Sequence, residues 1–220
     1  LHIKAMSKKA FIFDLDGVIV DTAKYHYKAW KKLANDLGFD FTETQNELLK
    51  GVSRVRSLEI LLEIGNISLP DDEKVQIMHN KNEHYLQYIT KMGQDEILKG
   101  MYEVLLYLKE NNIPFSLGSA SKNARLILTQ LNLIDLFDAI VDGNDVSKAK
   151  PDPEVFLIAA KKLNTNPNDC VVIEDAIAGV EAANVAGMTS IGIGNKKALK
   201  EADINLNSTA ELTIDMIKEL

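Results

Sequence analysis

Short apolar segments alternate along the chain with longer segments whose apolar positions repeat at helical spacing. The first apolar run covers residues 9–13 and is followed at once by the acidic sequence Asp14-Leu15-Asp16-Gly17. Apolar runs this short, ended by polar residues, are typical of strands that are buried on both faces of a sheet. The same pattern recurs in residues 114–119, 139–142, 170–175 and 189–194.

Helical patterns separate the later predicted strands. They cover residues 102–111, 123–131, 153–163 and 176–186. Pro153 stands near the start of one helix, where proline is tolerated, and Gly187 follows another as its expected C-cap. Because strands and helices alternate, the sequence predicts an α/β core: a doubly wound, Rossmann-like parallel sheet with helices on both faces.

Residues 21–92 interrupt this alternation because they contain no predicted strand. Helices are expected there at residues 25–37, 43–49, 54–64 and 71–92. We interpret this stretch as an all-helical domain of about 70 residues, an ordinary size for a small domain. The α/β core domain would then be discontinuous, formed by residues 6–20 plus 93–220.

Polar side chains stand where the predicted strands end. They are Asp14, Asp16, Ser119, Glu174 and Asp175, with Lys150 following the strand near Val141. In open α/β sheets, ligands bind at this edge. Four carboxylates converging there would repel one another, and a divalent cation is the simplest remedy. Oxygen ligands favour Mg²⁺, which would in turn attract a phosphate.

The two aspartates of the first loop could divide a phosphoryl transfer between them. At a spacing of two in an extended chain, Asp14 and Asp16 would point the same way. One carboxylate can attack phosphorus, and the other can move a proton to or from the substrate oxygen. Ser119 and Lys150 could hold the transferring oxygens by hydrogen bond and charge.

Each of these residues also has a purely structural interpretation. The Asp-x-Asp-Gly sequence can form a turn or a helix cap, and Ser119 can form a serine turn. Lys150 can be a solvated loop residue, and Glu174 and Asp175 can simply favour the dipole of the following helix. Their coincidence at successive strand ends favours a shared site.

Charge limits the partners that the chain can bind. The sequence has 25 basic and 32 acidic residues, a formal net charge of −7. This balance argues against nucleic acid, which requires a basic face. It does not exclude a small phosphorylated substrate, because a few lysines or one cation can reverse the local sign.

Composition adds expectations about location and assembly. The chain is 46% apolar and 26% charged, as in globular proteins. Cys170 is the single cysteine, so no internal disulfide can form and a reducing compartment is expected. No apolar run approaches the roughly 18 residues that a membrane span needs. We expect a cytoplasmic monomer whose natural start is Met6.

These motifs, in this order, resemble those of the haloacid dehalogenase (HAD) superfamily of phosphotransferases. In chain order they are Phe13-Asp14-Leu15-Asp16-Gly17-Val18-Ile19, Ser119, Lys150-Pro151-Asp152-Pro153 and Ile173-Glu174-Asp175. Together they fall within residues 11–187, and the combination is highly specific. The resemblance implies a HAD-type core in which the helical insertion is the superfamily's small cap domain.

The resemblance implies roles for the strand-end carboxylates. Asp14 would be the nucleophile that becomes phosphorylated, and Asp16 would be the general acid and base. Mg²⁺ would be held by Asp14, the backbone carbonyl of Asp16, Asp175 and, through water, Glu174. Residues of the second and third motifs would surround the transferring phosphoryl group, namely Ser119, Ala120 and Lys150.

A closer resemblance is to phosphomutases of this superfamily. It rests on Asp21-Thr22-Ala23 with His26 and Trp30, Lys50-Gly51-Val52-Ser53-Arg54 with Ser57, and Ser119-Ala120-Ser121-Lys122-Asn123. It implies interconversion of β-glucose 1-phosphate and β-glucose 6-phosphate through a bound β-glucose 1,6-bisphosphate.

A mutase must seat a second phosphate away from the metal. Arg54 offers a fork suited to phosphate, and residues 50–53 add a charge, a hydroxyl and backbone donors. Without the resemblance, the same residues would be interpreted as a solvated loop between helices. The resemblance also implies that Lys122 and Asn123 would help to hold both the transferring phosphoryl group and the sugar phosphate.

The resemblance also assigns residues near the junction of cap and core. Thr22 would lie at the hinge, and His26 would help to place Asp16 when the cap closes. Lys81 matches a further position of the family. Trp30 is expected in the cap core rather than against the sugar.

Two other functions compete with the mutase. A phosphatase for a sugar phosphate or phosphoglycolate would share the aspartyl-phosphate step but pass the phosphoryl group to water. A signalling receiver module would also combine a parallel sheet with a phosphorylated aspartate. Receiver modules are shorter, lack a helical insertion and need no acid or base two residues beyond the nucleophile.

Overall fold

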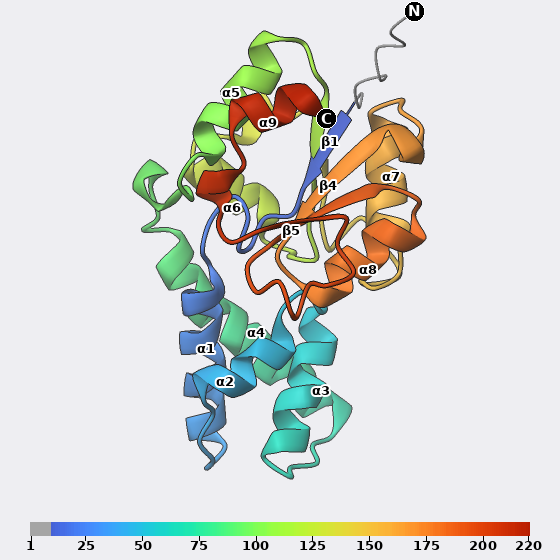
Figure 1. Ribbon diagram of the computed structural model, residues 1–220. Helices are drawn as coiled ribbons and strands as arrows, with labels where there is room; N and C mark the ends of the chain where they lie inside the picture. The colour runs from blue at the N-terminus through green and yellow to red at the C-terminus, as the bar shows by residue number, and fades with distance from the viewer. Residues whose placement is uncertain (1–9) are drawn as a thin grey trace, which may run out of the picture.

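Six parallel strands form the sheet of the computed structural model, which describes residues 10–220 (Figure 1). They are β1 (Ala10–Phe13), β2 (Phe115–Gly118), β3 (Ala139–Val141), β4 (Cys170–Glu174), β5 (Thr189–Ile193) and β6 (Ile204–Leu206). Their order in the sheet is β3-β2-β1-β4-β5-β6. The strand order reverses direction at β1, which pairs with β2 on one side and β4 on the other. Ligand sites lie beside such a switch point.

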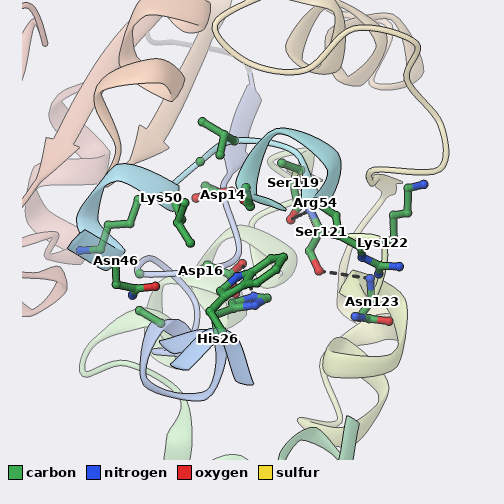
Figure 2. Close-up of a pocket in the computed structure, with 18 of the residues that line it drawn as sticks. Asp14, Asp16, His26, Asn46, Lys50, Arg54, Ser119, Ser121, Lys122 and Asn123 are labelled. Atoms are coloured by element: carbon green, nitrogen blue, oxygen red, sulfur yellow. Dashed lines mark hydrogen bonds and ion pairs between the residues drawn. The ribbon is translucent and has the colours of Figure 1, made fainter. Parts of the chain in front are cut away.

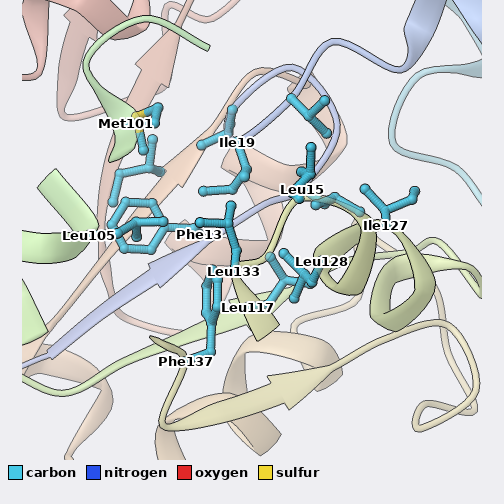
Figure 3. Close-up of a cluster of buried hydrophobic side chains, with 14 of the residues drawn as sticks. Phe13, Leu15, Ile19, Met101, Leu105, Leu117, Ile127, Leu128, Leu133 and Phe137 are labelled. Atoms are coloured by element: carbon cyan, nitrogen blue, oxygen red, sulfur yellow. The ribbon is translucent and has the colours of Figure 1, made fainter. Parts of the chain in front are cut away.

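Five helices accompany these strands within the described chain. They are α5 (Met101–Glu110), α6 (Ala124–Gln130), α7 (Glu154–Lys162), α8 (Ile177–Val185) and α9 (Ile214–Glu219). Alternate residues of β1 point to opposite faces of the sheet and pack into different hydrophobic clusters. Phe11 and Phe13 join the cluster shown in part in Figure 3, with Leu105 of α5, whereas Ile12 packs with Phe156 of α7. Burial on both faces explains why the strand is continuously apolar.

Four further helices lie beyond the carboxyl ends of the strands, in the lower part of Figure 1. They are α1 (Ala23–Asp36), α2 (Glu43–Asn46), α3 (Arg54–Ile64) and α4 (Asp71–Ile89). They enclose a separate apolar cluster that includes Trp30, Phe41, Leu58 and Leu61. The predicted fold class is confirmed: an α/β sheet with an inserted helical cap.

Two stretches of chain connect the cap helices to the sheet, and they run beside each other. Val20 forms an isolated antiparallel bridge with Ile97, and the backbone N–H of Leu98 donates to Ile19 at 2.8 Å. The Tyr25 hydroxyl donates to Glu96 across the same junction. These contacts tie the start of the cap to its exit.

The structure adds elements that the hydrophobic pattern did not predict. Strand β6 and helix α9 were missed because β6 has three residues, all only half-buried, and α9 has six. The helix expected at residues 43–49 is α2 continued by a 3-10 turn, Glu47–Leu49. The predicted start at Met6 lies outside the described residues.

Candidate active site

A cavity of about 100 Å³ lies between the carboxyl ends of the strands and the cap helices, and both layers line it (Figure 2). The predicted site residues along its wall are Asp14, Asp16, His26, Lys50, Gly51, Val52, Arg54, Ser57, Lys81, Ser119, Ala120, Ser121, Lys122, Asn123 and Asp175. The fold therefore brings most of the predicted set, from widely separated stretches of chain, to one place.

Four predicted site residues do not line this cavity. Thr22, Lys150 and Glu174 are buried behind it, in contact with residues that do line it. Ser53 instead caps α3, where its Oγ accepts a hydrogen bond from the Arg56 N–H at 3.2 Å. It borders an adjoining cavity of about 280 Å³.

Lys150 is the buried cation of the core side. Its Nζ donates to Asp14 Oδ1 at 3.1 Å, to Glu174 Oε1 at 2.7 Å and to the Gly118 carbonyl oxygen at 3.1 Å. All three ammonium protons are therefore used. Burial opposes its charge, but the two carboxylates outweigh burial and raise the pKa of Lys150. The interpretation of Lys150 as a solvated loop residue is wrong.

Three carboxylates meet next to this lysine. Asp14, Glu174 and Asp175 each offer an oxygen, and these oxygens lie within 4.8 Å of one another. The second oxygen of Glu174 accepts a hydrogen bond from the Ala176 N–H at 2.9 Å, which fixes its orientation. A compact set of hard oxygen donors fits Mg²⁺.

Burial and repulsion raise the proton affinity of these carboxylates. Burial raises the pKa of Asp14 well above its usual range, and the Glu174 carboxylate adds to the shift. Burial also raises the pKa of Asp175 to about 8, with Glu174 adding to the shift and Lys50 opposing it. One lysine cannot balance three carboxylates, so a divalent cation would complete the charge and displace protons.

The Asp16 side chain has a different set of partners. Thr22 Oγ1 donates to its Oδ1, and His26 Nε2 lies 3.6 Å from its Oδ2. The cluster of carboxylates at the strand ends therefore has three members and does not include Asp16. The sequence had predicted that all four carboxylates would meet there. The chain is no longer extended here: it turns at Gly17, whose φ is +79° and whose N–H donates to the Val20 carbonyl at 2.8 Å.

His26 is held by its neighbours in the cap. Its ring stacks on Tyr85, with centroids 4.1 Å apart, and its Nδ1 lies 3.1 Å from Lys81 Nζ. When Lys81 is charged it can only donate, and Nδ1 is then the acceptor, with the Nε2–H directed to Asp16. Burial lowers the pKa of His26, and Lys81 adds to this shift.

Lys81 is the buried lysine of the cap side. Its ammonium lies 4.3 Å from the Trp30 ring centroid and 4.9 Å from that of Tyr85. Burial lowers the pKa of Lys81 to about 7, and Arg54 adds to the shift. Trp30 packs in the cap core as expected, and it also lines the cavity.

Successive serine turns shape the loop that follows β2. Ser119 Oγ accepts the Ser121 N–H at 3.1 Å, and Ser121 Oγ accepts the Asn123 N–H at 3.1 Å (Figure 2). Ser119 thus forms the serine turn that its structural interpretation predicted. The turns set the path of residues 119–123, all of which line the cavity.

A glycine loop of the cap closes against the core. Gly51 has a φ of +73°, and a Cβ there would lie 2.9 Å from the Ala176 Cβ. The neighbouring Lys50 forms an ion pair with Glu47 at 3.1 Å and remains partly exposed. The close approach to Ala176 requires glycine, since a larger residue would push the cap away.

Sequence reasoning missed two asparagines that line the cavity. Asn46 ends α2 and is buried, and its Oδ1 has no hydrogen-bond partner among the described residues. Asn82 follows Lys81 on α4 and accepts two side-chain hydrogen bonds. No motif or periodicity distinguishes either asparagine from those on the surface.

A model of the haloacid dehalogenase-like hydrolase family matches residues 8–187. The chain therefore belongs to this family, as its motifs predicted. Among curated proteins it is similar to the β-phosphoglucomutase of Bacillus subtilis strain 168, with 44% identity over 213 residues, 96% of this chain and 94% of the relative.

Two further similarities are to a second β-phosphoglucomutase and to a phosphatase. The crystal structure of β-phosphoglucomutase from Clostridium difficile superimposes with a TM-score of 0.93 at 47% identity, covering 97% of this chain and 96% of that one. A phosphorylated carbohydrates phosphatase of Thermotoga maritima is 30% identical over 219 residues, 96% of this chain and 99% of the relative. The relatives of this chain thus include both mutases and a phosphatase.

Proposed function

We propose that this chain is a phosphomutase that interconverts β-D-glucose 1-phosphate and β-D-glucose 6-phosphate. The observation that carries the proposal is the two-sided cavity. Its core wall bears the carboxylates for phosphoryl transfer, and its cap wall bears cations that can receive a second phosphate. The extent of the similarity to two β-phosphoglucomutases supports the same activity.

On the core side, Asp14 is the proposed nucleophile. Its carboxylate attacks the phosphorus of a bound sugar bisphosphate, forming an aspartyl phosphate as the bond between phosphorus and the sugar oxygen breaks. Lys150 holds the attacking carboxylate in place through its 3.1 Å hydrogen bond. Ser119, Ala120 and Lys122 border the position of the transferring group.

Asp16 is the proposed general acid and base. It gives its proton to the sugar oxygen when the phosphoryl group leaves and removes one when the sugar attacks the aspartyl phosphate. Thr22 donates to one carboxylate oxygen of Asp16, and His26 Nε2 lies 3.6 Å from the other, so that Asp16 has partners different from those of Asp14. This separation of partners suits two carboxyl groups with different tasks.

Asp14, Asp175, the backbone carbonyl of Asp16 and Glu174 would hold Mg²⁺. When bound, the ion supplies positive charge for the carboxylates and for the phosphoryl oxygens. The chain contributes the arrangement of these donors, since Lys150 and the Ala176 N–H fix Glu174.

On the cap side, Arg54 is the proposed main ligand of the second phosphate. Lys50, Ser53 and Ser57 of the cap would support it, together with Lys122 and Asn123 from the core loop after β2. Conversion requires both ends of the same sugar to reach Asp14 in turn, with β-glucose 1,6-bisphosphate as the intermediate. The cap, proposed as residues 21–92, would therefore open to let the intermediate turn round.

A phosphatase is the alternative, and the relative in T. maritima supports keeping it. Both activities form the aspartyl phosphate and differ in the acceptor. A receiver module gains no support, because the chain belongs to a different family and carries the helical cap.

Phosphorus NMR separates these functions. The protein is mixed with Mg²⁺, β-glucose 1-phosphate and a trace of glucose 1,6-bisphosphate, with α-glucose 1-phosphate as the matched control. We expect glucose 6-phosphate from the β anomer alone, with little free phosphate. Release of inorganic phosphate as the main product would refute the mutase.

Location and assembly are also proposals. None of the helices formed within residues 10–220 is long and apolar enough to cross a membrane. Cys170 is buried and is the single cysteine of the sequence, and we propose a cytoplasmic monomer.

A further inference from the structure

One carboxamide oxygen joins the cap to the core at the cap-side end of the cavity. Asn82 Oδ1 accepts a hydrogen bond from Arg54 Nη2 at 3.0 Å and another from Asn123 Nδ2 at 2.8 Å. Arg54 begins α3 and Asn82 lies on α4, both in the cap. Asn123 precedes α6 in the core. The three side chains line the same cavity.

The geometry fixes the orientation of the Asn82 amide. Arg54 has five N–H donors and no acceptor, so only the oxygen of Asn82 can face it. The two hydrogen bonds then use both lone pairs of that oxygen. Four N–H groups of Arg54 remain free of Asn82 and can bind a phosphate.

The neutrality of Asn82 matters as much as its position. Within the described part of the chain, Arg54 forms no ion pair with a carboxylate, unlike Arg56 two residues later, which pairs with Glu59 and Glu63. A carboxamide can hold a guanidinium without cancelling its charge. Arg54 is thus oriented by a side chain and still carries a full positive charge for an incoming dianion.

We propose that Asn82 is a positioning residue that assembles the second-phosphate seat and links it to cap closure. This inference rests on the proposed mutase function. The bond to Asn123 can form only when α4 lies against the loop after β2. Arg54 and Asn123 are therefore brought into one array in the closed arrangement, where the second phosphate of the sugar can contact both.

Two substitutions test this role. Asn82→Ala removes the acceptor, and we expect KM for β-glucose 1-phosphate to rise about tenfold, the effect of one charged hydrogen bond. Asn82→Asp keeps the shape but pairs with Arg54 and repels phosphate, so kcat/KM should fall about 100-fold. Asn80→Ala is the matched control, because Asn80 is exposed on the same helix and bonds to Gln76.

A second substrate separates positioning from general support of the site. Acetyl phosphate can phosphorylate Asp14 but has no second phosphate to fill the seat. For each Asn82 variant, the loss of kcat/KM relative to the wild type should be smaller with acetyl phosphate than with β-glucose 1-phosphate. The two losses should differ by at least about tenfold. Circular dichroism melts establish that each variant is folded.

The outcomes distinguish the inference from the function on which it rests. If the wild type interconverts the sugar phosphates and both variants stay within about twofold of it, the role of Asn82 is wrong. Equal losses on the two substrates also overturn it, since Asn82 would then support the whole site. If the wild type releases only inorganic phosphate, the mutase function itself has failed.

Discussion

On the core side of the cavity, the Lys150 side chain is 1% exposed and its three donors are all used by neighbours. On the cap side, the Lys50 side chain is 35% exposed and pairs with one nearby glutamate. On the core side, Asp14, Glu174 and Asp175 lie at or directly after the ends of paired strands, whereas on the cap side Lys50 lies in a loop between helices. The core wall is preformed, and the cap wall depends on closure.

This contrast suits the two tasks of a mutase. The reacting phosphoryl group needs a nucleophile and charges held in fixed geometry, which strand ends supply. The second phosphate needs a seat that can release it, so that the sugar can turn round. Substitutions in each wall, and the effect of pH on magnesium binding, test this contrast.

Asp14→Asn should abolish the function of the core wall. Without a nucleophile, turnover of β-glucose 1-phosphate should fall by about 10⁴-fold or more, measured by phosphorus NMR. Asp36→Asn is the control, because Asp36 is exposed and pairs only with Lys32 among the described ion pairs. Turnover by this variant should equal that of the wild type. Turnover by Asp14→Asn within about 100-fold of the wild type would show that Asp14 is not the nucleophile.

Lys150→Met should destabilise the core wall, because it leaves buried carboxylates without their cation. In EDTA, the free energy of unfolding by urea should fall by about 3–5 kcal/mol. The exposed Lys148→Met should change it by less than about 0.5 kcal/mol. A loss below about 1 kcal/mol for Lys150→Met would mean that the cluster tolerates the missing charge.

Arg54→Ala should impair the cap wall selectively. For β-glucose 1-phosphate, kcat/KM should fall about 100-fold, with a smaller loss for acetyl phosphate, in steady-state assays. Arg56→Ala is the control, because Arg56 is exposed and pairs with glutamates on its own helix. Unchanged turnover by Arg54→Ala would show that Arg54 does not bind the second phosphate.

Magnesium should stabilise the protein more at higher pH. Since the pKa of Asp175 is raised to about 8, the folded metal-free state holds protons that the unfolded state has released. Its stability therefore falls as pH rises from about 4 to 8. Mg²⁺ binds the deprotonated carboxylates, so its effect on Tm should grow by a few degrees between pH 6 and 8. The opposite trend in differential scanning fluorimetry would contradict the assignment.

Much of the architecture was predictable from hydrophobic pattern. The five strands expected from short apolar runs are all present, and α3 covers the predicted residues 54–64. These predictions worked because strands buried on both faces are continuously apolar. Strand β6 was not predictable in this way, since it is a short edge strand whose hydrogen bonds to β5 define it.

In the candidate site, too, some features could be predicted from the sequence and others could not. The convergence of Asp14, Ser119, Glu174 and Asp175 was predictable because strand ends of a parallel sheet meet at one edge. Lys150 reaches the same edge from the connection between β3 and α7. That rule failed for the orientation of Asp16. The turn at Gly17 directs its carboxylate toward the cap, to partners on another element.

The fold class and the family could be predicted from the sequence, because they depend on local pattern and on motif order. Contacts between distant segments appeared only in the folded structure. This structure placed the Lys81 ammonium against His26, left the Asn46 oxygen without a partner, and made Asn82 the bridge from Arg54 to Asn123. Such pairings join residues up to 55 positions apart, and no periodicity in the chain records them.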